Sequence, residues 1–302
     1  MVTSKIKRTV RFHEIRMLMG DRSPVNQEQW HTIFTETHSR FSKVKSPDRT
    51  IIRNGIEYVG WASNDANTTE DYFIIGRRRS PADNPGVEDG ATLPTPLELE
   101  EGLLLVEPVY VISVKDTPYV VTIGSSGCPR SGAIADWITR KGGYIDQDLE
   151  VSIVPVLRRD AMNRLQRAKA ATALTVKVSA ASIDSSHSSR LSQALRASKG
   201  LIEDDGTISL SISLGRHKKN RDSEFALLDD VQELAGLSAA NTAQARVLVP
   251  EGDKMVTEMI DFIKDKLTDQ VTLDGDPNEP PSHATMIRAM LEAVSKHRSQ
   301  LP

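Results

Sequence analysis

The sequence is poor in the features that identify secreted, membrane and disulfide-rich proteins. It has one cysteine, Cys128, among 302 residues, which excludes an intramolecular disulfide framework and any zinc site built from several cysteines. No stretch approaches the run of about 18 apolar residues that a membrane helix needs. The N-terminal segment contains Arg11, His13 and Glu14 and therefore lacks the apolar core of a signal peptide. We expect a cytoplasmic protein.

Motifs that carry catalysis or bind metals are also missing from the sequence. The seven histidines are scattered, and none belongs to an HxH or HExxH motif. The glycine-rich segment Gly124–Gly132 lacks the Lys-Ser or Lys-Thr pair of a phosphate-binding loop. It is typical of a flexible turn, and an anion site at the N-terminus of the following helix is the lesser alternative. These absences predict no cofactor, no metal ion and no enzymatic activity.

Hydrophobic spacing in the N-terminal part predicts strands mixed with helices. Residues 6–12 alternate as in a strand. A helix is expected after Ser23-Pro24, which offer an N-cap and a first-turn proline. Its apolar stripe consists of Trp30, Ile33, Phe34, Thr37 and Phe41. Asn54-Gly55 predicts a tight turn between two short strands.

The middle of the chain predicts a hairpin, a short helix and a further strand. Residues 103–114 and 118–123 are strongly apolar and are expected to pair as adjacent strands. Ser131 is expected to cap a helix that Gly142-Gly143 end. Residues 150–157 are expected to form the next strand.

After Pro155 the expected elements alternate between strands and helices. Strands are expected at 172–178, 208–214 and 246–249. Helices are expected after Asp184 or Ser185, after Asp222 or Ser223, and from Asp253. The stripe of this third helix would contain Val256, Met259, Ile260, Ile263 and Leu267. The alternation predicts a small α/β domain.

These elements together predict an α+β protein of two domains. Residues 1–158 and 272–302 form the expected globular α+β domain, and residues 159–271 the smaller α/β domain. Ser282 is expected to cap a terminal helix with an apolar stripe at Ile287, Met290, Leu291 and Val294. The segment 80–101 is rich in proline, glycine and acids, so we expect a mobile, acidic surface loop there.

Charge is distributed unevenly along the chain. Residues 155–221 carry thirteen lysines and arginines against five acids, a net charge of +8, whereas the whole chain is at −3 and the following tail, residues 222–302, at −8. The basic clusters are Arg158, Arg159, Arg164, Arg167 and Lys169; Arg216, Lys218, Lys219 and Arg221; and Arg77, Arg78 and Arg79. One such cluster is usually only a solvated surface. Three clusters with few aromatic residues nearby indicate contact with a phosphate backbone rather than with bases.

Three stretches of the sequence carry a resemblance to a known protein family. They are LLLVEPVYVISV, the loop and helix ending in GAIADWITRKGG, and VSIVPVLRRD with the downstream AKAATALTVKV. In this order they resemble the RexA family, the intracellular sensors of phage Rex exclusion systems, diffusely from about residue 51 to the terminal helix. The family's basic run corresponds here to Arg216, Lys218, Lys219 and Arg221. The longer acidic loop at 80–101 and the N-terminus depart from the family.

The resemblance implies a homodimer in which a globular domain is joined to a mobile, swivel-like domain at 159–271. It implies sequence-nonspecific binding of double-stranded DNA within a prophage-encoded, RexAB-like exclusion system that acts against phages by abortive infection. The protein would work in the cytoplasm of the bacterial host as a sensor upstream of a RexB-like membrane protein.

Two other functions stay open on the sequence. The basic segment also fits a nuclease-type abortive-infection toxin, although the sequence does not show which carboxylates would form its catalytic pair. A third possibility, after the nuclease, is an interaction protein whose acidic tail binds its own basic segment. Binding to random duplex DNA would separate the DNA-binding function from the interaction protein. Cleavage with Mg²⁺ or Mn²⁺ would identify the nuclease.

Overall fold

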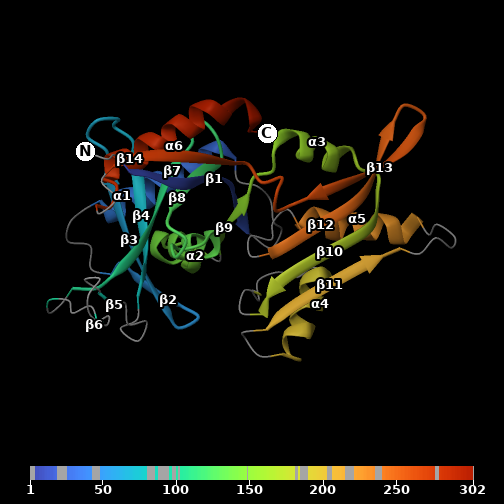
Figure 1. Ribbon diagram of the computed structural model, residues 1–302, viewed down its shortest axis with the longest axis horizontal. Coiled ribbons are helices and arrows are strands. Elements are labelled where there is room, and N and C mark those ends of the chain that lie inside the picture. The colour runs from blue at the N-terminus through green and yellow to red at the C-terminus, as the bar shows by residue number, and fades with distance from the viewer. Residues whose placement is uncertain are drawn as a thin grey trace. The chain divides into compact units, whose positions relative to one another are not determined.

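The computed structural model describes residues 4–18, 26–42, 48–79, 86–87, 95–96, 100, 103–147, 149–180, 183, 190–202, 206–214, 221–234, 240–275 and 279–301. The described residues form six α-helices and two larger antiparallel sheets of eight and four strands, which confirms the predicted α+β class. The chain divides into two compact units (Figure 1). Unit 1 is Met1–Ile153 with Asp269–Ser295, and unit 2 is Val154–Thr268 with Lys296–Pro302. Independent motion of the two predicted domains stays a prediction.

Unit 1 is built on the eight-stranded sheet. Its strands follow the order β14-β1-β8-β7-β4-β3-β2, and β9 pairs with β1 beside this path. The bounds are β1 Ser4–Leu18, β2 Thr50–Arg53, β3 Ile56–Asn64, β4 Asp71–Arg78, β7 Val106–Ser113, β8 Tyr119–Gly124, β9 Glu150–Pro155 and β14 Thr268–Gly275. The expected hairpin at 103–123 is confirmed as the β7–β8 pair. Strand β14 was not predicted.

The turn between β2 and β3 confirms the Asn54-Gly55 prediction. Both residues have positive φ, 51° at Asn54 and 75° at Gly55. A two-residue hairpin turn with two positive φ angles matches the twist of the strands and favours this residue pair. Within the expected acidic loop, β5 (Gly86–Val87) pairs with β6 (Thr95–Pro96). Most of residues 80–101 lie outside the described residues, so the mobility of the loop stays a prediction.

Three helices accompany this sheet: α1 (Gln27–Phe41), α2 (Ser131–Gly142) and α6 (His283–His297). All five stripe residues predicted for α1 are buried. The cap predicted at Asp222 or Ser223 is wrong, because helix α5 (Arg221–Leu234) already contains both residues. Two cap predictions in unit 1 are also wrong. The side chain of Asn26, not of Ser23, caps α1, and Ser131 is the first residue of α2, whose N-cap Arg130 makes no side-chain cap. The Ser282 cap of α6 is confirmed, because its hydroxyl accepts the Thr285 N–H at 3.2 Å.

The two faces of the unit 1 sheet bury different helices. Helices α1 and α2 share one hydrophobic core with β4 and β7 residues such as Phe73 and Val111. Tyr110 points to the opposite face, where its hydroxyl lies 2.8 Å from Nδ1 of His283 on α6. Ile287 and Met290 of α6 are fully buried. Three of the four stripe residues predicted for the terminal helix are therefore buried within their own chain, and Leu291 is half-buried. The expected homodimer remains a prediction.

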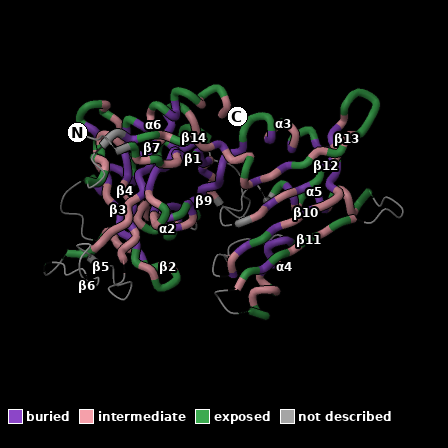
Figure 2. The backbone as a smooth tube through the Cα atoms, viewed as in Figure 1, coloured by how far each residue is buried: buried purple, intermediate pink, exposed green. Residues whose placement is uncertain are grey.

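Unit 2 consists of a four-stranded sheet with helices. The strand order is β11-β10-β12-β13, and every adjacent pair is antiparallel. The elements are α3 Arg159–Arg167, β10 Ala170–Ser179, α4 Arg190–Lys199, β11 Thr207–Ser213, α5 Arg221–Leu234, β12 Ala240–Glu251 and β13 Lys254–Asp261. Buried residues alternate with less buried ones along β10 (Figure 2). The buried ones belong to a core that also contains apolar residues of α3, α4 and α5. All three helices therefore pack on the same face of this sheet.

The helix predicted from Asp253 is wrong. Residues 254–261 form strand β13, which pairs with β12 through the two-residue turn Gly252-Asp253. Val256 and Ile260 fit a helical period and also the period of two of a strand. Gly252 has a φ of 58°, which permits the tight turn and therefore favours a hairpin over a helix here. The sheet is also antiparallel throughout, unlike the parallel sheet of an α/β domain.

Candidate nucleic-acid interface

The structure describes one of the two predicted DNA-binding clusters in full. In the other, Arg216, Lys218 and Lys219 lie outside the described residues, and Arg221 is exposed at the start of α5. Residues Arg158, Arg159, Arg164, Arg167 and Lys169 are all described. They lie on α3 and the residues that flank it.

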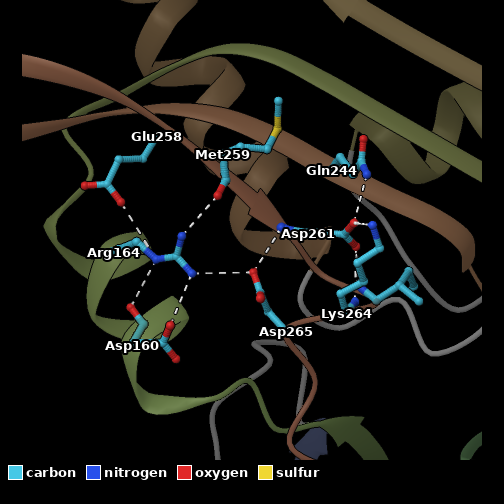
Figure 3. A network of polar contacts seen from close by, with 9 residues as sticks. Asp160, Arg164, Gln244, Glu258, Met259, Asp261, Lys264 and Asp265 are labelled. Carbon is cyan, nitrogen blue, oxygen red and sulfur yellow. Dashed lines mark hydrogen bonds and ion pairs between the residues drawn. The ribbon is translucent and has the colours of Figure 1, made fainter.

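Arg164 differs from the rest of its cluster because acids surround it (Figure 3). Its guanidinium lies 3.4 Å from the Asp160 carboxylate, 3.8 Å from Glu258 and 3.6 Å from Asp265. Nη1 also donates a hydrogen bond to the Met259 carbonyl at 3.1 Å. Three carboxylates more than neutralise one guanidinium, so Arg164 offers little charge to a phosphate. Its geometry is that of a structural link from α3 to β13 and the following turn.

Asp261 organises that turn at the end of β13. Its carboxylate accepts hydrogen bonds from the backbone N–H groups of Ile263 and Lys264, both at 3.1 Å, and from the Gln244 amide at 2.8 Å. Its own N–H donates to the Asp265 carboxylate at 3.1 Å. Burial acts to raise the pKa of Asp261, but the hydrogen bonds and the Lys264 charge together hold it below its ordinary value. The turn therefore stabilises an ionised carboxylate.

No acid among the described residues offsets the charge of the other four cations of the cluster. Arg158, Arg159, Arg167 and Lys169 are exposed. Arg159 donates to the Ser299 carbonyl at 3.2 Å and Arg167 to the Pro250 carbonyl at 2.7 Å. A carbonyl orients a guanidinium without neutralising it. Among the described residues, none of these four forms an ion pair with an acid. They are the part of the cluster that remains able to meet phosphates.

The third predicted cluster, Arg77 to Arg79, lies in unit 1 and is largely neutralised. Arg78 pairs with Glu57 and Arg79 with Glu107, each at 2.8 Å. The two units also differ in overall charge. Unit 2 carries 19 lysines and arginines against 15 acids, a net charge of +4, whereas unit 1 carries 19 against 26, a net charge of −7. A net positive charge is therefore a property of unit 2 alone.

The segment Gly124–Gly132 has the geometry of a packed turn. A Cβ at Gly127 would lie 2.3 Å from the Glu107 carboxylate, and one at Gly124 would lie 2.6 Å from the Cys128 sulfur. The nearby carboxylate would repel an anion, which favours the turn over the anion site. Burial raises the pKa of the Cys128 thiol, so the thiol is not activated as a nucleophile.

Neither a metal centre nor a membrane helix emerges from the described part of the chain. No group of three or more His, Cys, Asp or Glu residues is placed there to hold a metal ion. The carboxylates around Arg164 already have a cation at their centre. Within the same ranges, no helix combines the length and the apolarity required to cross a bilayer.

Comparison with known families gives one match, over residues 130–300, which is more than half of the chain. The chain belongs to DUF6731. DUF6731 is a family of unknown function, so membership assigns no activity. The range matched to DUF6731 begins at the N-terminus of α2 and contains Val154–Thr268, the main segment of unit 2. A comparison with curated proteins found no match.

Proposed function

We propose that this DUF6731 protein binds double-stranded DNA without sequence preference through the phosphate backbone. One observation carries the proposal: Arg158, Arg159, Arg167 and Lys169 are exposed and no described acid neutralises them, in a unit with a net charge of +4. Each phosphate that such a cation neutralises releases a condensed counterion, which drives association. Arg216, Lys218, Lys219 and Arg221 are proposed to contribute to the same binding.

The local backbone supports an anionic ligand near Arg158 and Arg159. These residues are the N-cap and the first residue of α3. The first turn of a helix presents N–H groups without intrahelical partners, and the helix dipole is positive there. Two arginines at this end work against the dipole in the absence of a ligand. An approaching phosphate would relieve that repulsion.

The residue content of unit 2 favours a duplex over a single strand. Its aromatic residues are Phe225 and Phe262, and Phe262 is buried in the core. Proteins that bind single strands stack bases on several exposed aromatic rings. A surface with cations and few rings contacts the backbone and does not read bases.

The wider biological role rests on the RexA resemblance alone. We propose that the protein acts as a homodimer in the cytoplasm of a bacterial host, within a prophage-encoded, RexAB-like exclusion system. In that setting DNA binding would be the sensing step, and a RexB-like membrane protein would be the downstream partner. A mobile, swivel-like domain at 159–271 would carry the DNA contacts.

The test is a titration of the purified full chain with two unrelated random duplexes, followed by fluorescence anisotropy at several salt concentrations. We expect equal affinity for both duplexes and a slope of log K against log salt of about −0.9 per phosphate contacted. A flat salt dependence, or a strong preference for one duplex, would refute the proposal. Cleavage of the DNA with added Mg²⁺ or Mn²⁺ would replace it by the nuclease function.

A further inference from the structure

One face of the four-stranded sheet in unit 2 carries none of the described helices. The core residues of β10 and β12 point toward α3, α4 and α5. The residues between them point the other way, to the side that we call the open face. Ser209, Ser211 and Ser213 of β11 are exposed there, as are Lys177 of β10 and Arg246 of β12. The alternation of β11 therefore places a row of hydroxyls beside two cations.

The strand register fixes how these groups lie relative to one another. Lys177 is paired with Ser209, Thr175 with Ser211, and Ala173 with both Ser213 and Arg246. Opposed residues of an antiparallel pair point to the same face. Lys177 and Arg246 lie two rows and one strand apart, so their Cα atoms are about 14 Å from each other. Long side chains with this spacing can reach phosphates on both sides of a groove about 12 Å wide.

The charge on the open face has one sign over β10, β11 and β12. In the described part of the chain, neither Lys177 nor Arg246 has an acidic partner. The register places Asp261 on the same face, at the end of β13, and the Gln244 amide, Lys264 and two backbone N–H groups already engage its carboxylate. A face that serves only solubility mixes charges of both signs. This one presents cations and hydroxyls over β10, β11 and β12, and the exposed Met255 and Met259 over β13.

Cations and hydroxyls are the side chains that donate to phosphate and sugar oxygens in protein–DNA interfaces. The open-face residues of the four strands include no aromatic ring, so bases have nothing to stack on. We propose that the open face is a phosphate-binding surface for double-stranded DNA, in which Lys177 and Arg246 supply the charge and the β11 serines supply hydroxyl donors. This inference rests on the proposed function and adds contacts to it that are separate from those of α3.

The decisive variant is the double replacement of Lys177→Ala and Arg246→Ala in the full chain. Both side chains are exposed, so circular dichroism and the melting temperature should match the wild type. The matched control is Lys5→Ala with Lys7→Ala, which removes the same charge from two exposed positions of β1 in unit 1. Each lost phosphate contact lowers the salt slope by about 0.9. We expect the open-face variant to lose about 1.8 from the slope and at least about tenfold in affinity, and the control to change little.

Four outcomes are distinct. If the wild type binds no DNA, the proposed function fails and this inference fails with it. If the wild type binds and the open-face variant keeps the wild-type slope, the inference is overturned while the proposed function stands. If the loss appears with a single-stranded oligonucleotide but not with a duplex, the assignment to duplex DNA is wrong. If the double variant does not fold, the single variants Lys177→Ala and Arg246→Ala replace it, each with an expected slope change of about 0.9.

Discussion

Replacing Arg164 by methionine separates a structural arginine from the DNA-binding ones. Methionine keeps an apolar stem of similar length and removes the guanidinium. The lost hydrogen bond to the Met259 carbonyl is worth about 1 kcal/mol. The three ion pairs have N–O distances of 3.4, 3.8 and 3.6 Å and are partly exposed, so each contributes about 0.3 kcal/mol. The expected destabilisation of unit 2 is therefore about 2 kcal/mol.

A loss of this size lowers the melting temperature of a unit this large by about 8 °C. Differential scanning calorimetry of the full chain measures the change. DNA affinity of the folded variant should stay within about threefold of the wild type, because three carboxylates already offset the Arg164 charge and solvent screens what remains. The control is Arg158→Ala, which should leave the melting temperature unchanged and lower the salt slope by about 0.9. An Arg164→Met protein that keeps its melting temperature but loses tenfold or more in affinity would refute the reasoning.

Three further predictions concern the fold and its response to pH. Gly55→Ala places a side chain at a φ of 75° and should cost about 1 kcal/mol in urea unfolding; an unchanged midpoint would contradict the assigned turn. Because folding lowers the pKa of Asp261, its carboxylate stabilises the folded state at pH values above its unfolded-state pKa. This stabilisation is lost as the pH falls through the folded-state pKa. In a plot of unfolding free energy against pH, Asp261→Asn should therefore reduce the slope at acid pH. A slope identical to that of the wild type would exclude this role of Asp261. Ile287→Lys puts a charge at a fully buried position and should destabilise unit 1 by several kcal/mol; a folded variant that keeps the wild-type melting temperature would contradict this burial.

Local signals in the sequence predicted the parts of the fold that depend on near neighbours. The α1 stripe, the Asn54-Gly55 turn and the β7–β8 hairpin follow from periodicity and turn chemistry within about 20 residues. Strand β13 was missed because its apolar residues fit two periods. The two-residue turn Gly252-Asp253 was the available signal for a hairpin.

The candidate site depends on contacts that sequence spacing does not contain. The ion pairs of Arg164 with Glu258 and Asp265 join residues about a hundred positions apart, so no local pattern distinguishes Arg164 from Arg167. Lys177 and Arg246 are single cations within strands, and no local pattern in the sequence predicts either as a DNA contact. Only the sheet register places them on one face. The alternation of serine with apolar residues at 207–213 was the one local signal for an exposed polar face.

The most direct test of the central claim is the salt slope of DNA binding for a variant that lacks the four unpaired cations of the α3 cluster. The variant combines Arg158→Ala, Arg159→Ala, Arg167→Ala and Lys169→Ala, all at exposed positions. The account predicts a folded variant whose melting temperature falls by at most about 8 °C, because two arginine–carbonyl hydrogen bonds are lost. Its slope should be smaller than that of the wild type by up to about 3.6. A folded variant whose slope and affinity equal those of the wild type would contradict the assignment of DNA binding to these cations.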